Sequence, residues 1–280
     1  MQRCRTWISA EEDFEHAEGR PWQVDPYGVR PAQIINMGNA GGSYEAFAYD
    51  VRSFETPRFF LTEDYVFGAL ERFTPTNPSW SDPWNMLVGP GVHEWLLLSP
   101  SLFDPTSGTY SWTTNLDTAR RNAGEHYPET EGIDVAGSNL FFVCKGIRRL
   151  FTLDLNGNTY TSSTTAATEL FEGEPDMIRT VLSEEAAAET LLYFTEDNGR
   201  RAGVHARNEA GELFTILEGF YSPETTGLAM SPNGMFLYVC FQEDGYCFEI
   251  KRTDGFSFRA KTLNLKRHPT EVGSSKSARA

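Results

Sequence analysis

The chain has 280 residues, 40% of them hydrophobic, which is enough for one large domain or two smaller ones with a buried core. Its 39 acidic and 24 basic side chains give a formal net charge of −15. This balance excludes nucleic acid and anionic membranes as partners, because both require a basic surface. Acidic groups can instead hold metal cations, although they also serve solubility alone.

The composition favours short strands, since Gly, Pro, Phe and Tyr are abundant and long helical stretches are few. No apolar run reaches the roughly 18 residues of a membrane span, so we expect no membrane insertion. The first residues, MQRCRTWISAEEDFE, lack the apolar core of a signal peptide. We therefore expect either that the protein is cytosolic or that a leader precedes the given sequence, in which case the protein is secreted or periplasmic.

Four segments repeat one pattern along the chain: an apolar strand, a short polar link and a second alternating strand. They are residues 59–73, 140–155, 191–208 and 237–252. In the first and third, the leading strand ends in the same three residues, Thr-Glu-Asp. A period of about 50 residues built of short strands is typical of a propeller blade. We predict an all-β fold, a β-propeller of five or six blades over residues 1–266 with its N-terminal blade missing, and a disordered tail over 267–280.

Two further features belong to the connections and the cysteines. The segment SEEAAAET, residues 183–190, predicts one short helix with a Ser cap and an acidic first turn. Cys4, Cys144, Cys240 and Cys247 lack zinc spacing. Cys144 and Cys240 lie in apolar runs and are expected to be buried thiols. Alternatively, Cys240 and Cys247 could face each other across a hairpin, but the sequence does not decide whether they form a disulfide.

The motifs resemble those of the PhoX-type alkaline phosphatase family. RTWISAEE, residues 5–12, resembles the family's TPWGTWLSCEE, and WQVDPYG, residues 22–28, resembles VVEIDPYD. NMGNAGGSYEAFAYDV, FFLTEDYVFGALERF, HYPETEGIDV and PETTGLAMSPNGMFLYVCFQEDG are similar to four later family motifs, in the family's order. The resemblance implies a six-bladed propeller that carries calcium and iron ions at its axis and hydrolyses phosphate monoesters, which are small-molecule substrates.

Under this resemblance, acidic side chains are the candidate metal ligands. The inner strand ends of a propeller converge on one channel, where carboxylates repel one another unless cations bind. Glu45 and Glu131 align with two family glutamates. The whole candidate set is Glu45, Glu131, Glu224, Glu11, Glu12, Glu63, Asp64, Glu196 and Asp197. The alternative for the acid pairs that end strands is a turn role, in which they cap backbone N–H groups.

Two residues depart from the family pattern. Ala10 stands where the family has a cysteine that ligates iron, and Glu129 stands where it has an arginine that helps to hold phosphate. Calcium accepts flexible oxygen cages, so calcium is the cofactor expected to remain and iron is the doubtful one. Three functions stay open: a metal-dependent phosphate monoester hydrolase, impaired by these two residues; a non-catalytic calcium-binding propeller scaffold; and a calcium-dependent lactonase-like hydrolase. We expect a monomer.

Overall fold

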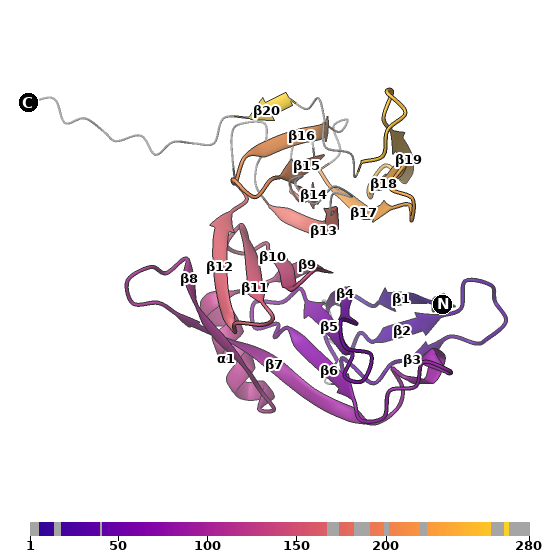
Figure 1. Ribbon diagram of the computed structural model, residues 1–280, viewed down its shortest axis with the longest axis vertical. Coiled ribbons are helices and arrows are strands. Elements are labelled where there is room, and N and C mark those ends of the chain that lie inside the picture. Colours follow the sequence, from indigo (N-terminus) through magenta and orange to yellow (C-terminus); the bar gives the residue numbers. More distant parts are fainter. Residues whose placement is uncertain are drawn as a thin grey trace, which may run out of the picture. The chain divides into compact units, whose positions relative to one another are not determined.

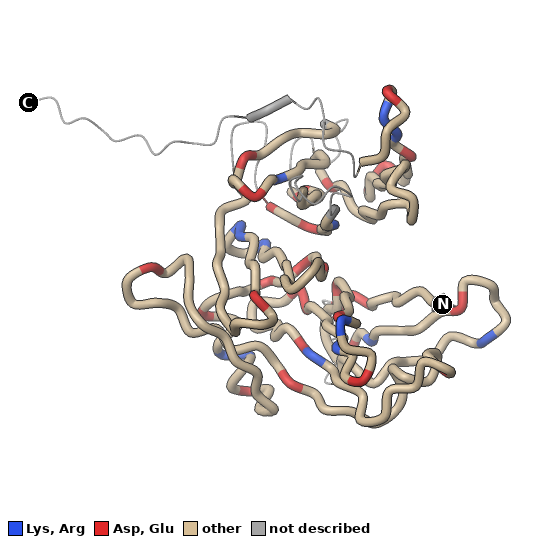
Figure 2. Tube along the Cα trace, in the orientation of Figure 1, with Lys and Arg blue, Asp and Glu red and all other residues tan. Residues whose placement is uncertain are grey.

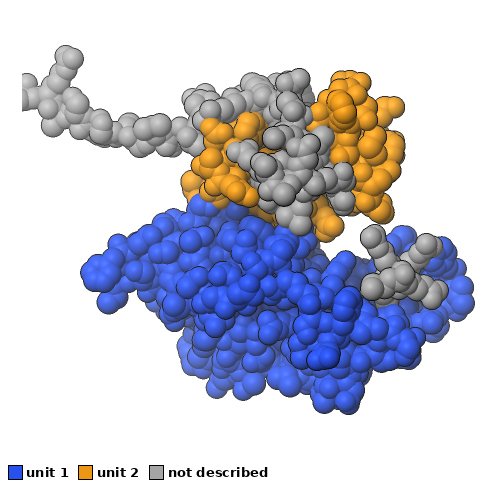
Figure 3. All heavy atoms as spheres, in the orientation of Figure 1, with its two compact units in different colours: residues 1–163 blue, residues 164–280 orange. Residues whose placement is uncertain are grey.

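A computed structural model describes residues 6–13, 18–39, 41–166, 174–181, 191–198, 202–218, 223–258 and 266–268 (Figure 1). The chain divides into two compact units, residues 1–163 and 164–280 (Figure 3). Each unit is described by itself below. Acidic residues outnumber basic ones along the trace, as the sequence requires (Figure 2). Among the described residues, no helix is long and apolar enough to cross a membrane.

Unit 1 contains a small sheet of three strands and a large sheet of nine. The small sheet has the order β1 (Trp7–Ala10), β2 (Pro21–Val24) and β3 (Gln33–Ile34). The large sheet has the order β4-β5-β6-β7-β8-β12-β11-β10-β9. Its strands are β4 (Tyr44–Asp50), β5 (Arg58–Glu63), β6 (Glu71–Pro75), β7 (Gly91–Pro100), β8 (Ser107–Thr113), β9 (Thr130–Ala136), β10 (Asn139–Cys144), β11 (Arg149–Asp154) and β12 (Thr159–Thr164).

The nine-stranded sheet consists of two blade-like halves, β4–β8 and β9–β12, which are joined where β8 pairs with β12. The first and last strands, β4 and β9, also lie side by side, so the sheet nearly closes on itself. A short 3-10 helix, η1 (Pro83–Asn85), follows β6. The helix α1 (Leu116–His126) connects the two halves and packs on β7. It is capped by Asn115, whose side chain accepts a hydrogen bond from the Thr118 N–H.

Unit 2 repeats this plan with two sheets. One has the order β13 (Pro175–Val181), β14 (Leu191–Glu196), β15 (Gly203–Arg207), β16 (Leu213–Glu218) and β20 (Lys266–His268); the other has β17 (Thr225–Met230), β18 (Phe236–Phe241) and β19 (Tyr246–Lys251). The inner strands β13 and β17 lie side by side, as β4 and β9 do in unit 1. A disulfide between Cys240 and Cys247 joins β18 to β19, which resolves the alternative that the sequence left open.

The repeated Thr-Glu-Asp has a structural role in both units. Thr62 and Thr195 are fully buried, and each hydroxyl accepts a hydrogen bond from the backbone of the preceding inner strand, from the Ala46 N–H at 3.0 Å and from the Met177 N–H at 2.9 Å. In each case the inner strand bulges, so that two residues face one threonine. The threonine side chain thus satisfies a backbone group that the bulge removes from the ladder.

A second threonine links neighbouring blades. The Thr130 hydroxyl, at the start of β9, accepts from the Glu63 N–H at 3.2 Å and donates to the Glu63 C=O at 3.1 Å. In unit 2, the Thr225 hydroxyl accepts from the Glu196 N–H at 3.1 Å in the same way. The backbone of Glu63 and of Glu196 thus ties the end of the second strand of one blade to the start of the first strand of the next.

The prediction of an all-β fold is confirmed. The helix expected over 183–190 lies outside the described residues. Of the expected tail, Arg267 and His268 pair with β16 as part of β20, whereas residues 269–280 lie outside the described part of the chain.

We expect Thr130→Val and Thr225→Val each to lower the free energy of unfolding by about 1–2 kcal/mol, because valine keeps the shape but leaves buried backbone groups without this partner. Urea unfolding of the two variants and the wild type measures the loss. The matched control is Thr109→Val on the exposed face of β8, for which the change should stay within about 0.5 kcal/mol. Equal stability of Thr130→Val and the control would contradict the blade link.

Candidate functional site

The bulges of β4 and β9 bring two of the predicted ligands together. In β4, Tyr44 pairs with Glu63 and Phe47 with Leu61, so Glu45 lies in the bulge. In β9, Glu131 lies at the corresponding position. A β-bulge re-aims a side chain, and here one carboxylate oxygen of Glu45 lies within 4.8 Å of one of Glu131. Glu131 is buried, with 2% of its surface exposed.

A lysine that the sequence did not indicate lies beside this pair. The Lys145 Nζ is 2.7 Å from the Glu131 Oε1 and 3.1 Å from the Asp64 Oδ2. Burial alone would lower the pKa of Lys145, but the Glu131 and Asp64 carboxylates outweigh it and raise the pKa above its ordinary value. The ammonium therefore stays protonated and offsets part of the negative charge at the bulges.

The other predicted ligands of unit 1 lie elsewhere. The Glu11 carboxylate accepts a hydrogen bond from the Arg20 N–H at 3.0 Å in an exposed turn. Glu12 is exposed and forms an isolated bridge with Ser43. Glu63 lies in a separate pocket, described below.

In unit 2, the predicted ligands make contacts within their own blades. The Glu196 Oε2 lies 3.0 Å from the His205 Nε2, with both residues buried. The Asp197 side chain accepts from the next residue's N–H at 2.6 Å. Glu224 precedes β17 by one residue, so the position that corresponds to Glu131 is held by Thr226.

Sequence reasoning missed Asp176, which has the same place in β13 as Glu45 has in β4. Asp176 is buried in the bulge of β13, and its Oδ2 accepts a hydrogen bond from the Thr195 hydroxyl at 3.2 Å. A sequence signal for it was present. In both β4 and β13 an acidic residue directly precedes the residue whose backbone N–H donates to the buried threonine.

The two carboxylates at the bulges of unit 1 could hold a metal ion. Two carboxylates on adjacent strands are oxygen donors of the kind that calcium takes. Ala10, on β1, has no donor atom and packs against the apolar core. Burial raises the pKa of the Cys144 thiol, so this buried group stays protonated.

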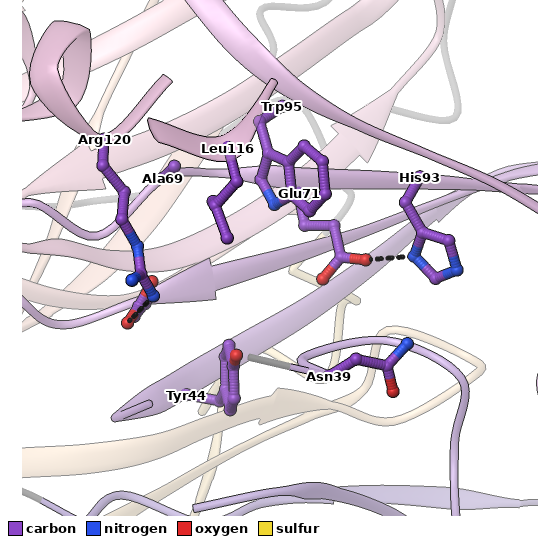
Figure 4. Close-up of a pocket in the computed structure, with 9 residues that line it drawn as sticks. Asn39, Tyr44, Ala69, Glu71, His93, Trp95, Leu116 and Arg120 are labelled. Atoms are coloured by element: carbon purple, nitrogen blue, oxygen red, sulfur yellow. Dashed lines mark hydrogen bonds and ion pairs between the residues drawn. The ribbon is translucent and has the colours of Figure 1, made fainter. Parts of the chain in front are cut away.

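A cavity of about 360 Å³ opens in the same unit. Its lining is Asn39, Tyr44, Glu63, Ala69, Glu71, His93, Trp95, Leu116 and Arg120. Figure 4 shows Arg120 on one side and Glu71 with His93 on the other. The Glu71 Oε1 lies 2.7 Å from the His93 Nδ1, and the Arg120 guanidinium lies 3.6 Å from the Glu63 carboxylate.

Burial dominates the electrostatics of this cavity. It raises the pKa of Glu63 from 4.5 to about 7; Arg120 and a backbone hydrogen bond from Ala69 oppose the shift, and Glu71 adds to it. Burial, with the charges of Glu63 and Glu71, also raises the pKa of Tyr44, which therefore stays a neutral hydroxyl.

Comparison with known proteins supports the fold. No family model matches the chain, and no curated protein matches it. The solved structure of PhoX from Pseudomonas fluorescens in complex with vanadate, a transition state analogue, is similar with a TM-score of 0.64 at 13% identity, covering 87% of this chain and 59% of that one. A nidogen/laminin complex matches with a TM-score of 0.47 at 12% identity, covering 88% of this chain and 78% of that one.

The fold and the likeness to the PhoX structure define a β-propeller class of protein, as the sequence predicted. The likeness to the PhoX structure is one of fold, and the chain spans about three-fifths of that protein's length.

The raised pKa of Glu63 predicts a pH-dependent stability. A folded pKa above the unfolded value favours the protonated form, so the stabilisation is present below pH 4.5 and is lost as the pH rises through about 7. We expect the free energy of unfolding of the wild type to fall by about 2 kcal/mol between pH 5 and pH 8 relative to Glu63→Gln, which cannot ionise.

Urea unfolding of both proteins at several pH values, in buffer with EDTA, measures this difference. The exposed carboxylate of Glu55 gives the matched control, and Glu55→Gln should follow the wild type. Parallel pH profiles for the wild type and Glu63→Gln would contradict the raised pKa.

Proposed function

We propose that unit 1 binds a divalent cation, calcium, between Glu45 and Glu131, and that the protein is a metal-dependent phosphate monoester hydrolase that acts as a monomer. The observation that carries the proposal is the pair of bulges that turn these two carboxylates toward each other within 4.8 Å. Two like charges at this distance are costly, and because Lys145 offsets only part of the charge, a bound cation would relieve the rest. The fold likeness to a phosphatase solved with vanadate supports the choice of substrate class.

The chain's own residues have distinct roles in this proposal. Glu45 and Glu131 hold the cation, and a bound cation supplies charge that orients and polarises a phosphoryl oxygen. Lys145, at 2.7 Å from the Glu131 carboxylate, reduces the negative charge that would repel a phosphate dianion. No step is assigned to iron, because the donor set lacks its ligand at Ala10.

A second candidate is a non-catalytic calcium-binding scaffold, which two residues favour. Lys145 already occupies part of the coordination capacity of Glu131. Glu129 has a left-handed backbone with φ 57°, fixed by backbone hydrogen bonds to Tyr65 and Lys145. Its side chain carries a negative charge where the PhoX-type family, which the sequence resembles, has an arginine. A carboxylate there disfavours an anionic substrate.

Calcium titration by calorimetry tests the cation site. We expect the wild type to bind calcium, and Glu45→Gln and Glu131→Gln each to bind at least about tenfold more weakly, since each removes one charged ligand. Lys145→Met should bind more tightly, because the ammonium no longer competes for Glu131. Glu55→Gln is the control and should bind as the wild type does. Equal affinity in all variants would refute the site.

Hydrolysis of p-nitrophenyl phosphate at alkaline pH separates the two candidates. The hydrolase predicts turnover that EDTA and Glu45→Gln abolish, and that Ala10→Cys with Glu129→Arg increases. Calcium binding without turnover in any of these proteins would reject the hydrolase and favour the scaffold.

A further inference from the structure

The two units differ at one blade position that lines the cavity of unit 1. In unit 2, Phe194 pairs with His205 across β14 and β15, and His205 reaches the carboxylate of Glu196. In unit 1, the corresponding pair across β5 and β6 is Leu61 with Glu71. The blade of unit 2 thus pairs an acid with a base, whereas that of unit 1 directs two acids, Glu63 and Glu71, into one space.

Unit 1 compensates only part of this charge. The carboxylate of Glu71 is held by the His93 Nδ1 at 2.7 Å and by the Gly38 N–H at 2.8 Å. Glu63 faces Arg120, from helix α1, at 3.6 Å, which is longer than a hydrogen bond. Arg120 is the one Lys or Arg among the lining residues, against two glutamates.

Two polar groups at the cavity lack a partner. Tyr44 is 5% exposed and lines the cavity, yet its hydroxyl makes no hydrogen bond to the described residues. The Arg120 Nε is buried and has no hydrogen-bond partner there either. A phenol hydroxyl can accept a hydrogen bond, so Tyr44 is available to a ligand that carries donors, whereas the Arg120 Nε–H needs an acceptor and gives no support to a cationic ligand. Tyr44 enters the cavity from below in Figure 4, between Arg120 and the Glu71–His93 pair.

We propose that this cavity, the Glu63–Glu71 pocket, binds a small organic monocation, a primary ammonium attached to an apolar body. The ammonium has three donors, which match the oxygens of Glu63, Glu71 and Tyr44. The rings of Tyr44 and Trp95 add cation–π attraction, and Leu116 and Ala69 provide an apolar wall.

Size and charge select this ligand class. A volume of about 360 Å³ is at the lower end of the range for small-molecule sites. The lining carries two glutamates against one arginine, and this excess of carboxylates disfavours phosphate and carboxylate ligands. The pocket does not include Glu45 or Glu131, so the proposal stands apart from the proposed hydrolase function.

The test compares three probes of nearly equal shape: benzylamine, benzyl alcohol and benzoate. Binding to the full chain is measured by calorimetry at pH 7.5 in EDTA, so that no cation site contributes. We expect benzylamine to bind at least about tenfold more tightly than benzyl alcohol, which is the scale of one charge-assisted hydrogen bond, and benzoate to bind more weakly still.

Variants locate the binding. Glu63→Gln should weaken benzylamine at least about tenfold, and Tyr44→Phe about threefold, whereas Glu55→Gln should leave it unchanged. Thermal unfolding checks that each variant is folded; if Glu63→Gln is not, Tyr44→Phe decides the question. Benzyl alcohol within threefold of benzylamine, preferred binding of benzoate, or no binding of benzylamine at about 10 mM would overturn the proposal.

Discussion

A threonine hydroxyl bonded to backbone groups of a neighbouring strand is the interaction on which the rest of the structure depends. Thr62 receives the N–H of a bulged residue in β4, and Thr130 receives the N–H of Glu63 from the adjacent blade. Together they fix where β4 bulges and how β9 lies against β5. Because Glu45 and Glu131 lie in those bulges, their separation is set by hydrogen bonds of the scaffold and not by the carboxylates themselves.

The sequence predicted the blades because their strands alternate apolar residues and end in repeated motifs. It also selected Glu45 and Glu131, whose carboxylates the structure brings together. It could not give the register of β17: the hydrogen bond between Glu196 and Thr225 makes Thr225 the counterpart of Thr130, which leaves Glu224 before the strand. A sequence motif carries no information on such a register, which only strand pairing defines.

The sequence did not predict the residues whose contact partners come from distant parts of the chain. Lys145 follows a strand end, where a solvated side chain is expected, yet it is half-buried and contacts Asp64 and Glu131. Arg120 lies on helix α1, which the sequence repeats did not predict. It lies near Glu63 because α1 packs on β7. Which Lys or Arg side chain neutralises a buried acid depends on tertiary contacts. The positions of acids in the sequence therefore indicate that a cation is required but not which residue supplies it.

The Cys240–Cys247 bridge has a practical consequence for handling the protein. Among the described strands, β19 is the last of its sheet, and a terminal strand held by one ladder is the first to fray. The covalent link prevents fraying only where thiols are oxidised. Protein recovered from a reducing bacterial cytosol would therefore carry a loosened edge prone to strand addition between molecules, whereas material from an oxidising secretory route would keep that edge closed.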